Sequence, residues 1–345
     1  MTPALRDSRF LRACRGEEVD ATPVWLMRQA GRYMKEYRDV RARVAFKDLC
    51  KDPALAAEVT DTAARRIGAD AAIVFSDILL ILEPMGAALE YEGAGGPRIE
   101  TRVASPEDVG RLRAADPEAL SFVYDAVRQS RAALPPDVPL IGFSGAPFTL
   151  ASYLIEGRSA REAEKTRIFM RTEPAAWNAL LGRLVDGLIP YLTRQAAAGA
   201  QALQIFDTWV GALGPSDYRA SVLPHMQRLV AALPAGVPVI VFGTGTAGIL
   251  ELLKETGAGV VGVDSRIGLG AARARLGATP VQGNLDSTVL FAGREVIRKA
   301  AAEVLDATRG RPGHVFNLGH GVLPGTPVDN VIALVDAVHE LSSRR

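Results

Sequence analysis

The chain has 345 residues, of which 48% are hydrophobic and 23% charged, a balance typical of a folded globular protein. Its 40 Lys and Arg residues nearly equal its 39 Asp and Glu residues, which leaves no global basic field for binding nucleic acid. Two cysteines, Cys14 and Cys50, are too few for a disulfide framework or a four-cysteine zinc site. No signal-peptide pattern or membrane-spanning apolar stretch is present, so we expect a soluble, cytoplasmic protein with no membrane partner.

Short apolar runs alternate with amphipathic helical patterns along the chain. In chain order, we expect strands over residues 23–27, 71–75, 139–143, 202–206, 237–242, 259–263, 279–282 and 314–318. The helical patterns cover residues 53–67, 117–134, 174–198, 216–233, 248–256, 294–309 and 328–341. Eight such units predict a (β/α)8 barrel of the TIM type, with a doubly wound open sheet as the alternative. No Ser-, Gly- or Pro-rich linker divides the chain, which favours a single α/β domain over residues 1–345.

Reactive residues of a barrel enzyme lie just after the strands, and polar side chains do follow the strands predicted here. Arg28 and Arg32 follow the first one, separated by residues that include Ala30 and Gly31. Two guanidinium groups at this spacing suit a ligand with several carboxylates. The alternative is a pair of arginines on the solvated surface.

Asp77 lies between the apolar residues 71–75 and 78–82. A carboxylate in such a run is expected to be desolvated and to need a charged or hydrogen-bonding partner. It is the best single candidate for stabilising a cation that develops during a reaction. The structural alternatives are a cap on the following segment and an internal ion pair with an arginine.

His320 follows the last predicted strand and has a glycine on each side, Gly319 and Gly321. Glycines at these positions would let the backbone approach a ligand closely. A lone histidine of this kind can equally be structural, so both interpretations stay open.

Other chemistries receive weaker support. The sequence GTGTAG at residues 243–248, with Asp264 after the next strand, matches a dinucleotide-binding fingerprint, but it stands in the fifth of eight units. Four strand-following aspartates would suit magnesium only if they converge: Asp77, Asp207, Asp264 and Asp286. No lysine lies on a predicted strand, which disfavours Schiff-base chemistry, and no histidine accompanies the cysteines as zinc ligands would require.

Longer motifs resemble those of the uroporphyrinogen decarboxylase family. Its N-terminal signature is similar to residues 23–33, PVWLMRQAGRY, followed by EYR at 36–38. A second signature resembles residues 142–153, GFSGAPFTLASY, followed by EG at 156–157. Shorter blocks match in the same order at residues 75–79, 206–209, 282–286 and 317–321. The resemblance covers essentially the whole chain, from about Arg9 to Leu341.

This resemblance implies a single-domain (β/α)8 barrel that works as a homodimer with no metal and no organic cofactor. The family removes carbon dioxide from the four acetate arms of uroporphyrinogen III and so produces coproporphyrinogen III for haem and related tetrapyrroles. By match to the family's motifs, Asp77 is the carboxylate that binds the pyrrole N–H groups. Further substrate contacts fall on Arg28, Gln29, Ala30, Gly31, Arg32, Phe46, Tyr153, Phe206, Thr208 and His320.

Roles for these residues follow from the chemistry. Protonation of the pyrrole beside the reacting arm makes the ring itself the electron sink, and Asp77 would stabilise the resulting cation. We expect Arg28 to be a proton donor or carboxylate clamp and Arg32 a second clamp. Tyr153 and His320 would be orienting hydrogen-bond donors, with His320 as an alternative acid.

The chain departs from the family pattern after Asp264. The family pattern has a tryptophan after Asp264, where this chain has Ser265, and this questions the packing of that loop more than the chemistry. The His and Cys residues that bind zinc in cobalamin-dependent methyltransferases of this fold are absent. A tetrapyrrole carrier that binds without turnover would keep the arginine loop but would not need Asp77.

Overall fold

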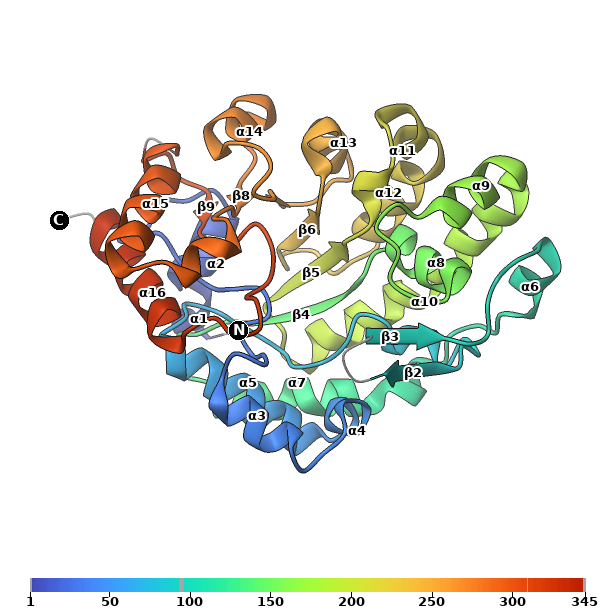
Figure 1. The fold of residues 1–345 in the computed structure, drawn as a ribbon, viewed down its shortest axis with the longest axis horizontal. Coiled ribbons are helices and arrows are strands. Elements are labelled where there is room, and N and C mark those ends of the chain that lie inside the picture. The colour runs from blue at the N-terminus through green and yellow to red at the C-terminus, as the bar shows by residue number, and fades with distance from the viewer. Residues whose placement is uncertain (1, 93–95, 309, 344–345) are drawn as a thin grey trace.

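Seven parallel strands form one curled sheet in this computed structural model, which describes residues 2–92, 96–308 and 310–343 (Figure 1). They are β1 (Ala72–Ile73), β4 (Leu140–Gly145), β5 (Ala202–Asp207), β6 (Val239–Gly243), β7 (Val260–Gly262), β8 (Val281–Gln282) and β9 (His314–Val315). Each strand pairs with the next one along the chain. Because the order never reverses, the sheet has no switch point, and the alternative of a doubly wound sheet is wrong.

Helices follow one another around the outside of this sheet (Figure 1). They include α5 (Pro53–Ile67), α7 (Ser121–Ala133), α10 (Pro174–Ala198), α12 (Leu223–Ala231), α13 (Leu250–Glu255), α14 (Leu269–Leu276), α15 (Arg294–Asp306) and α16 (Val328–Ser342). The last of these, α16, packs against α5. Within the described ranges, no helix is both long and apolar enough to cross a membrane.

The bounds of α5 are those predicted, because local signals fix both of its ends. Asp52 accepts hydrogen bonds from the backbone N–H groups of Ala54 and Leu55, and Pro53 occupies the first turn. Gly68 ends the helix in the left-handed conformation. The bounds predicted for α10 are confirmed too, whereas the pattern at 216–233 divides into α11 (Pro215–Ser221) and α12.

The prediction of a first strand over residues 23–27 is wrong. Pro23 has no backbone N–H to donate. The N–H groups of Leu26 and Met27 donate to side chains, at 3.3 Å to Gln29 Oε1 and 3.1 Å to Asn317 Oδ1. Side chains therefore take the hydrogen bonds that a regular strand would form.

Val24 nevertheless lies between the two edges of the sheet. It forms a single parallel bridge with Phe316, which follows β9, and its carbonyl accepts a hydrogen bond from the Asp70 N–H at 2.8 Å, just before β1. The Asp70 carboxylate binds the Val24 N–H at 2.7 Å and also pairs with Arg9 at 3.2 Å and His339 at 2.7 Å. Asp70 thus joins the N-terminal segment, β1 and α16.

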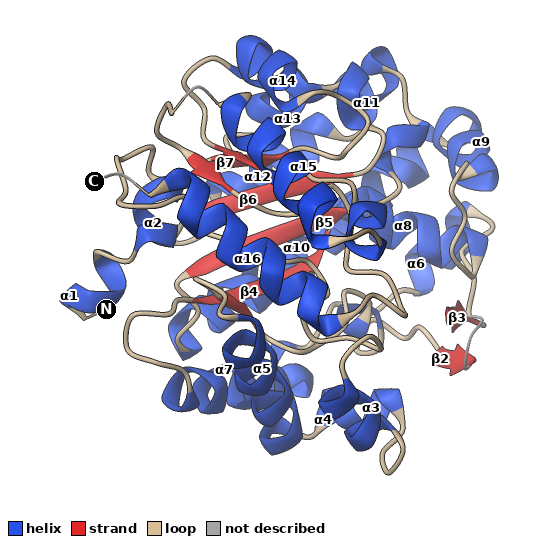
Figure 2. Ribbon diagram, turned by 60° about the vertical axis from the view of Figure 1, so that its left-hand side comes forward, coloured by secondary structure: helices blue, strands red, loops and turns tan. Residues whose placement is uncertain are grey.

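An antiparallel hairpin of β2 (Leu89–Glu92) and β3 (Gly96–Ile99) was not predicted and stands apart from the main sheet (Figure 2). The alternation Leu-Glu-Tyr-Glu followed by glycines was the signal that could have revealed it. The hairpin matters for the site because it carries Tyr91 close to Asp77.

The sheet is buried on both of its faces. One apolar cluster lies between the sheet and the helices and includes residues from Val24 to Val338. A smaller cluster joins α2 (Arg9–Cys14) to the alternate strand residues, among them Ile141 and Ile240. This layering explains why the strands are apolar on both faces, and it leaves the ends of the strands as the place for chemistry.

Candidate active site

Asp77 lies half-buried at the carboxyl end of β1. Burial raises the pKa of its carboxyl group, whereas the Leu79 N–H, the Tyr91 hydroxyl and the charge of Arg28 lower it. Oδ1 accepts a hydrogen bond from the Leu79 N–H at 2.8 Å, and Arg28 acts on it through space. The desolvation predicted for Asp77 is confirmed, and the carboxylate also caps the following turn, as the structural alternative had it.

Tyr91 is a neighbour of Asp77 that sequence reasoning missed. Its hydroxyl group is buried and has no partner at normal hydrogen-bond geometry, although it is close enough to lower the Asp77 pKa. Its ring lies 4.8 Å from that of Phe46 and forms part of the wall around the acid.

Arg28 has a left-handed backbone, with a φ of 61° that is uncommon outside glycine. Its side chain is exposed to solvent, yet nearby protein atoms remove part of its hydration. This burial and the charge of Arg32 lower the Arg28 pKa, whereas Tyr153 and Asp77 raise it. The structure therefore brings Arg28 into one electrostatic environment with Asp77, Tyr153 and Arg32.

Tyr153 lies buried on α8 (Pro147–Glu156), the helix that follows β4. Burial and the Asp77 charge raise its pKa, Trp209 and Arg28 lower it, and the net result is a pKa of about 12. Its ring centre lies 6.1 Å from that of Trp209. The phenol is therefore a neutral hydroxyl near neutral pH and can donate a hydrogen bond.

His320 lies after β9, on the same side of the sheet. Burial lowers its pKa, and the charges of Arg28, Arg161 and Arg266 lower it further, whereas the Gly321 carbonyl raises it. That carbonyl lies 3.4 Å from Nδ1. The imidazole is therefore neutral near pH 7, which suits an orienting role better than that of an acid.

The glycines beside His320 have a use besides the one predicted. Protein atoms occupy the space next to both: Ser265 packs against Gly319, and the Arg28 side chain packs against Gly321. The glycines therefore let two other loops approach the β9 loop. Close approach of the backbone to a ligand at these two positions stays a prediction.

The loop from Gln29 to Arg32 divides between structure and surface. The Gln29 side chain is buried, accepts from the Leu26 N–H at 3.3 Å and donates to the Ala71 carbonyl at 3.4 Å. Ala30 packs against the apolar core, the Gly31 carbonyl accepts a backbone hydrogen bond, and Arg32 is exposed. Their substrate contacts stay predictions, and the Gln29 side chain is already engaged in holding the loop.

Phe46 and Phe206, the two phenylalanines predicted to contact substrate, each lie beside other aromatic rings. Phe46, at the start of α4 (Phe46–Lys51), is half-buried and lies 5.9 Å from the Phe75 ring. Phe206, on β5, is half-buried between Phe143 at 5.6 Å and Phe242 at 6.3 Å. The structure thus packs both residues against other aromatic rings, and their role as walls of a substrate pocket stays a prediction.

Thr208 lies in a loop that hydrogen bonds hold in place. Its carbonyl accepts from the Thr244 hydroxyl at 2.6 Å. The preceding residue, Asp207, is buried and accepts from the Thr149 hydroxyl at 2.8 Å, and burial raises the Asp207 pKa to about 7. The Thr149 hydroxyl in turn accepts from the Trp209 N–H at 3.2 Å. Asp207 is therefore a structural acid beside the site.

The glycine-rich loop at 243–248 makes its own internal contact. The Gly245 N–H donates a hydrogen bond to Asp264 Oδ2 at 2.5 Å, and the Asp264 carboxylate is buried. The acid that a dinucleotide ribose would need is thus occupied by the loop itself, which disfavours the nucleotide interpretation. The described ranges contain no group of three or more His, Cys, Asp or Glu side chains placed to hold a metal ion, so the four aspartates do not converge.

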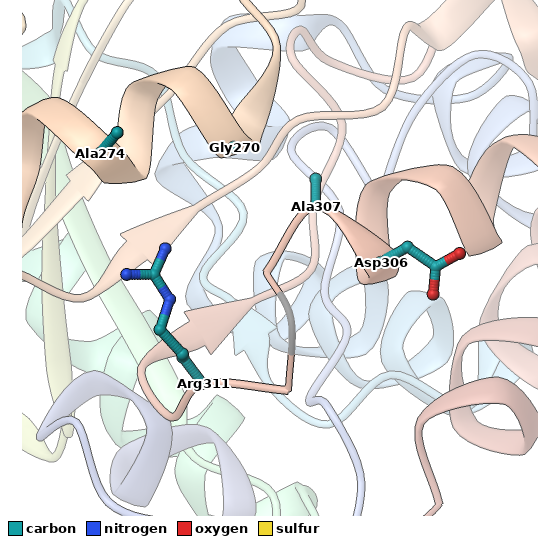
Figure 3. Close-up of a pocket in the computed structure, with 5 residues that line it drawn as sticks. All are labelled: Gly270, Ala274, Asp306, Ala307 and Arg311. Atoms are coloured by element: carbon teal, nitrogen blue, oxygen red, sulfur yellow. The ribbon is translucent and has the colours of Figure 1, made fainter.

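A cavity of about 510 Å³ lies elsewhere in the molecule (Figure 3). It is lined by Gly270 and Ala274 of α14 and by Asp306, Ala307 and Arg311 near the end of α15. The end of α15 leads into the start of β9, whereas Asp77 and His320 follow strands. This cavity is therefore separate from the residues assembled above.

Comparison with known proteins decides the family. The family model described as Uroporphyrinogen decarboxylase (URO-D) matches residues 5–341. The chain belongs to this family. It is 50% identical to a uroporphyrinogen decarboxylase from Roseiflexus sp. (strain RS-1), covering 97% of this chain and 99% of the relative. It is 49% identical to one from Thermus thermophilus, covering 97% of this chain and 98% of the relative.

A solved structure shares the fold at lower identity. It is a methyltransferase from Methanosarcina mazei, 22% identical, with a TM-score of 0.79 and coverage of 96% of this chain and 97% of that one. At this identity the similarity shows a common α/β architecture and carries no argument about the reaction.

Proposed function

We infer that the protein is an enzyme that decarboxylates uroporphyrinogen, converting its four acetate side chains to methyl groups in tetrapyrrole biosynthesis. Membership of the family at about 50% identity supports the reaction. The observation in the structure that best supports it is the desolvated Asp77 carboxylate at the carboxyl end of β1, whose pKa the charge of Arg28 lowers. An acid that is kept there, at a cost in solvation, is suited to stabilising a cation.

Each step exchanges one carboxylate for one hydrogen. A proton adds to the pyrrole ring beside the acetate arm, the bond to the carboxylate breaks, and its electron pair moves into the cationic ring as carbon dioxide leaves. The methylene group that remains takes up a proton as the ring loses one, so each arm consumes one proton overall. The ring is the electron sink, and the reaction needs no organic cofactor or metal.

Asp77 stabilises the protonated ring in this proposal. One of its oxygens accepts the Leu79 N–H, and the pyrrole N–H groups would donate to the carboxylate. A negative charge stabilises the cationic ring more than the neutral one, which is the differential binding that lowers a barrier. Arg28 binds the substrate carboxylates or donates the proton, and Arg32 is the second clamp.

Tyr153 and His320 orient the substrate as neutral hydrogen-bonding groups, because the pKa of Tyr153 is raised and that of His320 is lowered. Gln29, Ala30, Gly31 and Thr208 shape the loops around the macrocycle. Phe46 and Phe206 form its apolar walls.

The proposal extends to the architecture. Residues 23–25 lie between β9 and β1 and would complete the sheet as the eighth member of a closed (β/α)8 barrel in a single domain over residues 1–345. The Val24–Phe316 bridge and the hydrogen bond from Asp70 to Val24 support this closure. The homodimer and the cytoplasmic location are retained from the family resemblance and the sequence.

Anaerobic incubation of the purified protein with uroporphyrinogen III tests the function directly. Chromatography of the oxidised products should show species with fewer carboxylates, ending at coproporphyrin with four. A tetrapyrrole carrier would return the substrate unchanged, and that result would reject the enzyme.

A further inference from the structure

Thr149 joins α8 to the loop that follows β5. Its hydroxyl donates a hydrogen bond to Asp207 Oδ1 at 2.8 Å and accepts one from the Trp209 backbone N–H at 3.2 Å. Thr149 and Asp207 are fully buried, and Trp209 is half-buried. The hydroxyl thus spends its only donor, and one acceptor site, on the two residues that flank Thr208.

Thr208 is also held by the loop that follows β6. Its carbonyl accepts a hydrogen bond from the Thr244 hydroxyl at 2.6 Å. The chain around Thr208 is therefore tied at Asp207, at Trp209 and at its own carbonyl. These contacts set the place of the half-buried Thr208 side chain, which is a predicted substrate contact.

Tyr153, another predicted substrate contact, lies on the same face of α8 as Thr149, because residues four apart in a helix are neighbours. The Tyr153 ring centre lies 6.1 Å from that of Trp209, with the ring planes at 59°. Within the described part of the chain, the buried Trp209 indole N–H has no partner at normal hydrogen-bond geometry, yet it is close enough to lower the Tyr153 pKa. Trp209 therefore meets α8 at two points, its backbone at Thr149 and its ring at Tyr153.

The start of α8 adds a further contact with the same loop. Ala146, the N-cap residue, donates its backbone N–H to the Phe206 carbonyl at 2.8 Å. Positions 146, 149 and 153 are spaced by three and four residues, so they share one helix face, and they engage positions 206 to 209 in chain order. A change in how this face sits on the loop would therefore move Tyr153 relative to Thr208.

We propose that Thr149 is a positioning residue, which holds Tyr153 of α8 and Thr208 of the β5 loop in a fixed relation to each other. This rests on the proposed function, in which both of those residues face the substrate. Thr149 itself is fully buried, so it acts only through the residues that it holds. Correct placement of orienting groups matters because a displacement of about 1 Å can lower a rate by about 100-fold.

The test compares Thr149→Val with Thr256→Val, since valine keeps the shape of threonine and lacks its hydroxyl. Thr256 is a matched control: it is buried, its hydroxyl donates to the Leu253 carbonyl at 2.6 Å, and it accepts the Ala258 N–H at 3.3 Å. It precedes β7 and so lies at the opposite end of the sheet from the site. We expect Thr149→Val to lower kcat/KM for uroporphyrinogen by about 10- to 100-fold and Thr256→Val to stay within about twofold of the wild type. Thr149→Ser keeps the hydroxyl and should recover most of the loss.

Two further measurements separate positioning from a general loss of stability. In protein labelled with fluorotryptophan, the fluorine NMR signal of Trp209, assigned with Trp209→Phe, should shift in Thr149→Val and stay in place in Thr256→Val. In a Tyr153→Phe, Thr208→Val background, adding Thr149→Val should lower kcat/KM by less than about threefold, because the residues that it positions have already lost their hydroxyl groups. Thr149→Cys has a weaker donor and acceptor, so it replaces the valine variant if that variant does not fold and should show a smaller loss in the same direction.

Three results would each reject the positioning role and leave the proposed function standing: wild-type kcat/KM in the Thr149 variant, an unmoved Trp209 signal, or the same fold-loss in the wild-type and doubly substituted backgrounds. An equal loss in Thr149→Val and Thr256→Val would reject it as well, because loss of a buried hydroxyl anywhere would then suffice. A wild type that leaves uroporphyrinogen unchanged would overturn the proposed function, and this inference with it.

Discussion

Gly321 packs directly against the side chain of Arg28. A Cβ at position 321 would lie 2.5 Å from Arg28 Cδ and 2.7 Å from Cγ. Those atoms belong to the stem of the arginine, and its backbone is already held at a φ of 61°. The β9 loop therefore fixes where the Arg28 guanidinium points, although the two residues are far apart in the sequence.

The Gly321→Ala substitution should therefore displace the Arg28 side chain. We expect kcat/KM to fall by about 10-fold or more while the protein stays folded, because one charge-assisted contact is worth about 1.5–3 kcal/mol. Gly182→Ala in α10, where no atom lies within 4 Å of the added Cβ, is the matched control and should leave activity unchanged. Equal activity of the two variants would contradict the coupling of Gly321 to Arg28.

Asp77→Asn keeps an oxygen for the Leu79 N–H and removes the negative charge. If the charge stabilises a protonated pyrrole, turnover should fall by roughly 100-fold or more, the size typical of a lost electrostatic contact in a dry site. Stability should hold or rise, because burial raises the pKa of this acid and its ionised form is the costly one. Thermal melts and single-turnover assays on one sample measure both; a folded, fully active variant would reject the role of Asp77.

Arg28→Ala and Arg32→Ala should each weaken binding of the substrate by about 1.5–3 kcal/mol, because each removes a contact between a guanidinium and a carboxylate. Titration with uroporphyrin at low and high salt measures the effect. Salt should weaken wild-type binding only in part, since protein atoms around Arg28 desolvate its guanidinium group. Wild-type affinity in both variants would return these arginines to the solvated surface.

Asp207 predicts a pH dependence of stability. Burial raises its pKa from 3.8 to about 7, so between these values the folded protein binds more protons than the unfolded chain. Its contribution therefore lowers stability as pH rises through this window and is fully unfavourable above about pH 7, by up to about 4 kcal/mol. Asp207→Asn keeps an acceptor for the Thr149 hydroxyl. Denaturant unfolding should therefore show that the variant is more stable than the wild type at pH 8. The difference in free energy of unfolding between the two proteins should narrow toward pH 4. A difference in free energy of unfolding that does not change with pH would contradict a contribution from the titration of Asp207.

Activity should survive exhaustive chelation and dialysis and should not respond to added NAD. The Asp264 carboxylate is already bound to the Gly245 N–H, and the chemistry uses the substrate's own ring as electron sink. Steady-state assays before and after chelation measure this. Recovery of a lost activity by magnesium would revive the aspartate site.

The sequence alone determined the elements whose signals are local. Both α5 and α10 begin with a proline in the first turn and end at a glycine, and α5 has the Asp52 cap in addition. Asp77 stood out because two apolar runs flank it, and apolar runs indicate a buried segment whatever the tertiary structure. The family motifs are likewise contiguous stretches of sequence, readable without a structure.

Only the tertiary structure decided which loops meet. The tertiary structure places Tyr91 of the hairpin beside Asp77, Ser265 against Gly319 and the Arg28 side chain against Gly321. The first predicted strand failed for the same reason, since Asn317, almost 300 residues away in sequence, takes the N–H of Met27. Local periodicity reports burial along one element, whereas these contacts depend on the positions of several strand ends at once, which no single stretch of sequence contains.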